Sequence, residues 1–331
     1  MDWVIVAAGI LLLAIGMYVI LDGFDLGVGI LFPFVPDDAD RDRMIATISP
    51  VWDGNETWLV LGGVTLFSAF PLAYSVVLPA LYAGVMVLLA ALVFRGVAFE
   101  FRPRAEKRHL WNYAFFFASA IAAFAQGLVL GGFVEGFEVE EGRYIGGTFG
   151  WLTPFSLMTG LALVNGYALL GATWLILKTE GPLQEWCFRA GRVLLVGMSF
   201  FIVLVSIWTP LVQPEIAALW FTLPNLFYLS PIPLLTAWCV WRAWHLLSVR
   251  RERGPFPFAI ALFLLAYAGL GVSLWPYVVP RHYTIWDAAS PPESLSFMLI
   301  GVLLLLPLVL GYTVHVYRVF RGKVTQHTGY H

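Results

Sequence analysis

The sequence predicts an all-α polytopic membrane protein. Of its 331 residues, 60% are hydrophobic and only 12% are charged, whereas a soluble domain carries about 25% charged residues. Apolar runs of about 20 residues, long enough to cross a hydrocarbon core as helices, recur along the chain. The runs are continuous rather than alternating, which favours helices over the strands of a barrel. The net charge of −2 gives no bias towards a nucleic-acid partner.

The uninterrupted apolar runs predict nine transmembrane helices. The first run has no positive n-region and no cleavage site, so we interpret it as a true span rather than a signal peptide. The predicted spans are residues 3–32, 52–70, 75–99, 111–134, 152–177, 190–210, 224–246, 256–276 and 296–319.

The basic residues predict the orientation of these spans. Nine spans divide the loops into two sets, and of the 19 Lys and Arg residues all but Arg143 and Arg281 belong to one set. By the positive-inside rule, the N-terminus lies outside and the C-terminus is cytoplasmic. A count of eight or ten spans would spoil this separation. Cys187 and Cys239 fall near predicted cytoplasmic span ends, a reducing environment, so we expect no disulfide between them.

Four acidic residues mark the first two spans as the informative part of the chain. Asp22 and Asp25 lie in the first span, and Asp53 and Glu56 open the second. A carboxylate in an apolar span costs several kcal/mol unless it is neutralised, paired or hydrated. Asp22 and Asp25 lie about 30 Å along a helix that enters from outside, and so in the cytoplasmic leaflet. Two acidic helix faces across a hairpin are suited to passing protons inward.

Simpler interpretations of these acids remain open. Asp53 can be an N-cap or a first-turn acid favoured by the helix dipole, and Asp22 and Asp25 can belong to an interfacial turn. The glycines Gly23 and Gly27, four residues apart, favour close helix packing.

Two further residues near the acids also have two interpretations each. Arg95, at the end of the third span, is either a snorkelling side chain or the counter-charge of an acid. Trp52, beside Asp53, either anchors the helix end at the membrane surface or flanks a quinone-like ring.

The histidines are placed unfavourably for a haem, which in membrane helices needs buried histidines on facing helices. We therefore expect no metal site and no redox centre ligated wholly by this chain. The six histidines are His109, His245, His315, His327 and His331 at predicted cytoplasmic ends, and His282 in an outer loop.

Four segments carry a resemblance to a known family. They are YVILDGFDLGVGIL (18–31), ISPVWDGNETWLV (48–60), FRGVAFEFR (94–102) and WLTPFSLMTGLALVNGYALLGATWLILKTEG (151–181). In order and content they resemble subunit II of cytochrome bd-type quinol oxidases, the fourth particularly in the cyanide-insensitive branch.

The resemblance implies a fold and a place in an enzyme. The fold is a single integral membrane domain (1–331) of two four-helix bundles plus one peripheral helix, with approximate halves at 1–134 and 150–331. The partner, subunit I, would carry the b and d haems, oxidise quinol and reduce dioxygen to water in a bacterial inner membrane. This chain would support assembly and a cytoplasmic proton path. Some family members also hold a structural quinone, and the complex can include a small accessory subunit and lipids.

The resemblance also assigns roles to individual residues. Asp53 in WDGN takes the place of the family's proton-path aspartate, Trp52 that of its adjacent tryptophan, and Asp25 that of the second acid of DGFD. We expect Glu56 and Arg95 to assist them. A secondary transporter or ion channel, binding a cation at the same acids, is the rival interpretation, and a purely structural scaffold is a third.

Overall fold

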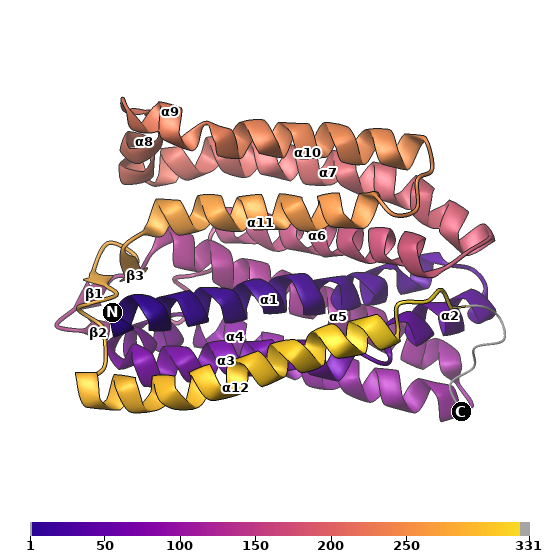
Figure 1. Cartoon of the computed structure of the whole chain (residues 1–331), viewed down its shortest axis with the longest axis horizontal. Helices are drawn as coiled ribbons and strands as arrows, with labels where there is room; N and C mark the ends of the chain where they lie inside the picture. Colours follow the sequence, from indigo (N-terminus) through magenta and orange to yellow (C-terminus); the bar gives the residue numbers. More distant parts are fainter. Residues whose placement is uncertain (1, 325–331) are drawn as a thin grey trace.

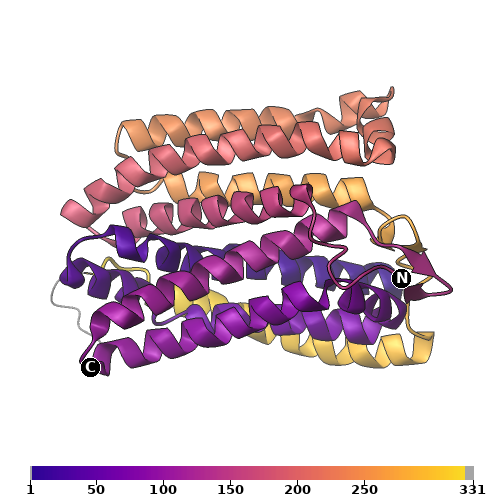
Figure 2. The same cartoon turned by 180° about the vertical axis from the view of Figure 1, so that it is seen from behind.

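The computed structural model describes residues 2–324. Its regular secondary structure is almost entirely helical. The long helices run side by side in an elongated bundle (Figures 1 and 2). Every predicted span overlaps one of them. These helices are α1 (Trp3–Leu31), α3 (Trp52–Ala69), α4 (Pro71–Phe101), α5 (Arg108–Glu135), α6 (Pro154–Lys178), α7 (Pro182–Val212), α10 (Pro231–Ser248), α11 (Pro255–Leu274) and α12 (Pro292–Val319).

A helix must also be long and apolar enough if it is to cross a membrane. Within residues 2–324, seven helices are long and apolar enough to cross a membrane, or eight if a bent pair forms one span. Helix α3 is not among them, because its first turns carry Asp53, Asn55 and Glu56. An all-α membrane fold is therefore confirmed, whereas nine crossings stay a prediction.

The seventh predicted span differs from the structure at its start. The segment 224–246 is not one continuous helix: α8 (Pro214–Phe221) and α9 (Asn225–Leu229) precede α10, and the chain bends by 89° between Phe221 and Asn225. Proline explains this break, because its ring lacks an N–H and clashes with the preceding turn. Pro224 stands immediately before α9, and Pro231, after Ser230, is the first residue of α10.

Short elements connect the long helices at both ends of the bundle. Helix α2 (Asp38–Ile48) follows α1, and its N-cap Asp37 accepts a hydrogen bond from the Ala39 amide at 3.0 Å. The other short elements are the 3₁₀ helices Phe32–Phe34 and Arg102–Arg104 and two antiparallel hairpins, β1 (Val139–Glu140) with β2 (Arg143–Tyr144) and β3 (Tyr277–Val279) with β4 (Tyr283–Thr284).

The tightest helix contact joins α1 to α6 through glycines. A Cβ atom on Gly27 would lie 1.8 Å from the carbonyl oxygen of Tyr167, and one on Gly171 would lie 2.3 Å from the carbonyl carbon of Gly27. A Cβ on Gly23 would meet the Tyr167 ring at 2.6 Å. The predicted packing role of Gly23 and Gly27 is thus confirmed.

The packing of α12 bears on the predicted division of the chain into two four-helix bundles. This last long helix lies along α1 and α3, at the start of the chain, and α1 itself packs on α6. The division into bundles at 1–134 and 150–331 stays a prediction.

The loops fall into two sets at opposite ends of the bundle. The N-terminus and both hairpins lie at one end, while α2, the α10–α11 loop and the C-terminal end of α12 lie at the other (Figures 1 and 2). The basic loops share the second end, as the sequence predicts. Which end faces the cytoplasm stays a prediction.

Candidate functional site

Two carboxylates on one face of α1 are fully enclosed by protein. Asp22 is 0% exposed and Asp25 is 1% exposed. Both lie within the continuous helix α1 rather than in an interfacial turn, so that simpler interpretation is wrong. A buried carboxylate requires hydrogen-bond or charge partners, and these come from α3, α4 and α12.

Arg95 on α4 supplies the charge partner. Its Nη1 lies 2.5 Å from Oδ1 of Asp22, and its Nη2 donates to the carboxylate of Glu56 on α3. Arg95 is only 2% exposed, as expected of a counter-charge and not of a snorkelling side chain. One guanidinium therefore holds acids from two helices together, using the paired donors that make arginine suited to carboxylates.

Asn55 on α3 supplies the hydrogen-bond partner of the second acid. Its Nδ2 donates to Oδ2 of Asp25 at 2.7 Å and to the Leu21 carbonyl at 3.2 Å. Its Oδ1 accepts a hydrogen bond from the Tyr317 hydroxyl of α12 at 3.0 Å. This buried amide joins α1, α3 and α12, and within residues 2–324 no cation forms an ion pair with Asp25.

Several buried atoms of the cluster keep unused hydrogen-bonding capacity. Oδ2 of Asp22, Oδ1 of Asp25 and Nε of Arg95 have no partner within the described residues, and neither has the Tyr18 hydroxyl. Buried polar atoms are almost always paired in proteins, with protein or with water. Of these atoms the two carboxylate oxygens can take a proton, whereas the guanidinium nitrogen and the hydroxyl can donate to an ordered water.

A narrow crevice opens beside Asp25. It is lined by Asp25, Ile48, Trp52, Arg95, Phe99 and Phe115, with about 170 Å³ of space between the atoms but no room for a water-sized sphere.

The Trp52 ring closes this crevice. Its centroid lies 5.8 Å from the Arg95 guanidinium and 5.2 Å from that of the Phe99 ring. One side of the Trp52 indole thus packs against Arg95 and Phe99, and a quinone contact at Trp52 stays a prediction.

Asp53 does not join the buried cluster. Its side chain is exposed, while Asn55, two residues further on, points to Asp25. Asp53 is not the N-cap of α3 either, since Val51 holds that position and Asp53 lies in the first turn. The structure thus brings together Asp22, Asp25, Glu56 and Arg95, with Asp53 on the outer face of the same helix.

A second polar network fixes α2 at the basic end of the bundle. Nε of Arg102 donates to Asn112 at 2.6 Å, and its Nη1 lies 2.5 Å from Asp42. On α2 itself, the hydrogen bond from Arg41 lowers the pKa of Asp38. These contacts join α2 to the 3₁₀ helix at the end of α4 and to α5.

In the part of the chain that the structure describes, no histidine lies in the buried interior of the bundle. Among residues 2–324, no group of three or more His, Cys, Asp and Glu side chains is placed to hold a metal ion. His109, His245, His282 and His315 are all exposed and stand apart from the buried acids. His327 and His331 lie outside the described residues.

Comparison with known proteins decides the family. The model of the family "cytochrome bd terminal oxidase subunit II" matches residues 3–320. The chain belongs to this family. Subunit 2 of the cytochrome bd-I ubiquinol oxidase of Escherichia coli K12 is 29% identical, over 98% of this chain and 94% of that one. Subunit 2 of the cytochrome bd ubiquinol oxidase of Bacillus subtilis 168 is also 29% identical, over 98% and 96%.

A solved structure supports the same fold. A chain of the bd oxidase from Geobacillus thermodenitrificans superimposes with a TM-score of 0.77 at 19% identity, covering 97% of this chain and 99% of that one. The chain is thus a subunit of a quinol oxidase complex, an oxidoreductase of the respiratory chain that contains haem, and it works with subunit I. This membership favours the oxidase over the transporter or channel interpretation.

Proposed function

We propose that this chain supports assembly of the oxidase and delivers cytoplasmic protons to subunit I, where the b and d haems lie, quinol is oxidised and dioxygen is reduced. The observation that carries the proposal is the buried cluster of Asp22, Asp25, Glu56 and Arg95. Intramembrane carboxyl groups joined by hydrogen bonds are the usual parts of proton relays, and reduction of dioxygen to water consumes protons.

The proposal gives each group a place along the path. The Glu56 side chain is 27% exposed and contacts Arg95, which itself contacts the enclosed Asp22. Asp25 has one oxygen held by Asn55 and the other free to take a proton. We assign to Asp53, exposed on the outer face of α3, the transfer of protons to subunit I.

The proposed path requires the predicted topology. The chain would cross a bacterial inner membrane nine times, with α3 as one crossing, the N-terminus outside and the C-terminus in the cytoplasm. Protons would then enter at the basic end of the bundle. A structural quinone would contact the outer side of the partly buried Trp52. Lipids and a small accessory subunit would complete the assembly.

The test is oxygen consumption by the purified complex carrying Asp53→Asn or Asp25→Asn. Each variant should slow turnover about 10²-fold, the lower end of what positioned proton-transfer groups contribute. The haem absorption spectra should stay unchanged, because the haems lie in the partner. Asp287→Asn, an exposed acid at the opposite end of the bundle, is the matched control. Unchanged oxygen consumption in both test variants would sink the proton-path assignment.

The partner assignment has its own test. A tagged chain, extracted in mild detergent, should bring down a haem-rich subunit with quinol oxidase activity. A colourless preparation of this chain alone would contradict it.

A further inference from the structure

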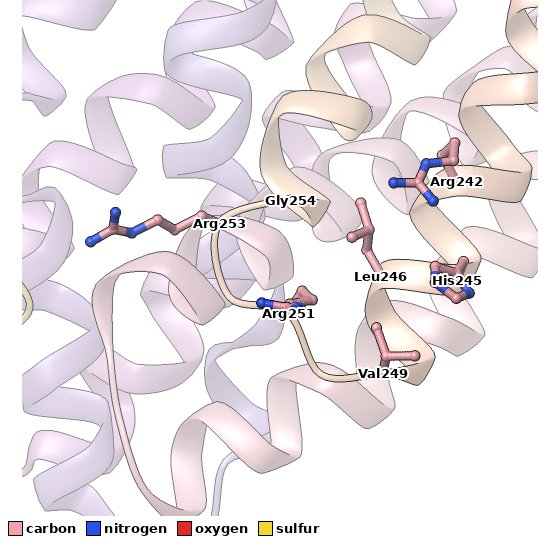
Figure 3. Close-up of a pocket in the computed structure, with 7 residues that line it drawn as sticks. All are labelled: Arg242, His245, Leu246, Val249, Arg251, Arg253 and Gly254. Carbon is pink, nitrogen blue, oxygen red and sulfur yellow. The ribbon is translucent and has the colours of Figure 1, made fainter.

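A basic hollow lies where α10 ends and α11 begins. It measures about 670 Å³ and is lined by Arg242, His245, Leu246, Val249, Arg251, Arg253 and Gly254. Figure 3 shows Arg242 and His245 on neighbouring turns of α10, and Arg251 on the loop that follows. The Arg253 side chain extends to the opposite side. Arg242 and Arg251 are therefore the cations that matter in the hollow.

The charges of this hollow are not neutralised by nearby acids. Glu185 pairs with Arg250 at 3.1 Å, and Glu252 pairs with Lys323 at 2.8 Å. Among the described residues, Arg242 and Arg251 form no ion pair. In the α4–α5 connection, by contrast, Arg102 and Arg108 both pair with Asp42. The α4–α5 connection also has two cations without an ion pair among the described residues, Arg104 and Lys107, but only the α10–α11 hollow places its free cations around a pocket.

Exposed aromatic side chains on α10 indicate that this hollow lies near the membrane surface. Trp238, Trp241 and Trp244 on α10 are 49%, 59% and 44% exposed, and exposed tryptophans concentrate at the membrane–water boundary. The Trp241 ring stacks on His245 at 6.4 Å and carries the Arg242 guanidinium 5.7 Å from its centroid.

The backbone of the loop is held to the end of α10. The Arg251 amide donates to the Leu246 carbonyl at 2.9 Å. A Cβ on Gly254 would lie 2.6 Å from the Leu246 side chain, so the chain passes close to that residue. The hollow is thus shaped by the fold, with apolar walls at Leu246 and Val249 between its cations.

We propose that this hollow binds the phosphodiester headgroup of an anionic phospholipid. The phosphate would lie between Arg242 and Arg251, since arginine forks match phosphate oxygens. The acyl chains would run along the exposed tryptophan face of α10. Basic pockets between membrane helices at the membrane surface are typical of anionic lipid sites.

The test measures lipid binding by the complete oxidase complex rather than its activity. Purified complex in detergent is titrated with phosphatidylglycerol or phosphatidylcholine, and native mass spectrometry measures the bound fraction. Wild type should prefer phosphatidylglycerol, and Arg242→Gln with Arg251→Gln should weaken that binding about fivefold for each arginine removed. If the double variant does not assemble, Arg251→Gln alone, in an exposed loop position, should still weaken phosphatidylglycerol binding about fivefold.

The matched control removes the same charge elsewhere. Arg104→Gln with Lys107→Gln, in the α4–α5 connection at the same end of the bundle, should keep wild-type affinity. Equal affinity for phosphatidylglycerol in the test and control variants would overturn the site. Inorganic phosphate is the second probe: if phosphatidylglycerol binds no more tightly than inorganic phosphate, the hollow binds free anions and the lipid assignment is wrong.

Discussion

Arg95 is the residue on which the buried cluster depends. It is enclosed, and it contacts Asp22 of α1 and Glu56 of α3 at once. Burying charges costs several kcal/mol for each ion, and the attraction between partners offsets this only when the geometry is good. Removing one charged partner should therefore lower the stability of the fold strongly, whereas removing all of the charges together should lower it less.

Arg95→Gln should destabilise the chain by about 3–5 kcal/mol, because two carboxylates then lack their counter-charge. The measurement is the free energy of unfolding in mixed detergent micelles. Combining Arg95→Gln with Asp22→Asn and Glu56→Gln should restore part of the loss, since no buried charge is then unpaired. Equal losses in the single and triple variants would contradict this account.

The acids of this cluster were predictable from the sequence, while some of their partners were not. Asp22, Asp25 and Glu56 stand out because a carboxylate interrupts an apolar run, which is a local signal. Asn55 belongs to the same WDGN motif, yet only the structure shows that it, rather than Asp53, turns towards Asp25. Tyr317 has no local signal, because 262 residues separate it from Asn55.

At the scale of elements, the α1–α6 contact sets the frame that holds the acids. Asp22 and Asp25 alternate along α1 with Gly23, which packs on the Tyr167 side chain, and Gly27, which meets the α6 backbone. The same stretch of helix thus carries the polar face and the packing face.

Gly27→Ala should destabilise the chain by at least about 1–3 kcal/mol, the usual cost of overpacking. The added methyl group would overlap the Tyr167 carbonyl, so the two helices would have to separate. The midpoint of thermal denaturation of the purified complex measures the effect. Gly9→Ala, on the same helix with no atom within 4 Å of its Cβ position, should leave the midpoint unchanged or slightly raised. A similar fall in both variants would show that helix packing is not the cause.

Most elements follow from hydropathy, and the exceptions have physical reasons. Apolar runs locate the long helices, because a backbone in lipid must satisfy its hydrogen bonds internally. Helix α2 is polar and escapes such a search. The break before α10 could have been expected from Pro224 and Pro231. A search for apolar runs misses it, because hydropathy does not record where prolines interrupt a helix.

At the scale of the whole molecule, the two ends differ in charge. The basic loops gather at the end that holds α2 and the α10–α11 loop, whereas Arg143 and Arg281 lie with the hairpins at the other. The sequence predicts this separation because the positive-inside rule concerns the loops and not the details of packing.

Cysteine labelling in intact cells tests the orientation. Gly147→Cys, in the exposed loop near the hairpins, should react with a membrane-impermeant maleimide, and Glu106→Cys should react only after permeabilisation. The background should be low, since the native Cys187 and Cys239 are buried. The reverse pattern would place the acids near the outer surface and exclude proton uptake from the cytoplasm through them.

The hydrogen bond between Asn55 and Tyr317 has a consequence for biosynthesis. Ribosomes add about 5–20 residues per second, so α12 emerges tens of seconds after α3. Arg95 follows Glu56 by only 39 residues, and the ion pairs can form early. The Asn55 amide, which binds Asp25, then lacks its Tyr317 partner until α12 inserts. If translation stops before α12, the nascent chain has its ion pairs, but its buried Asn55 lacks the hydrogen bond from Tyr317. Quality-control proteases can recognise such a state.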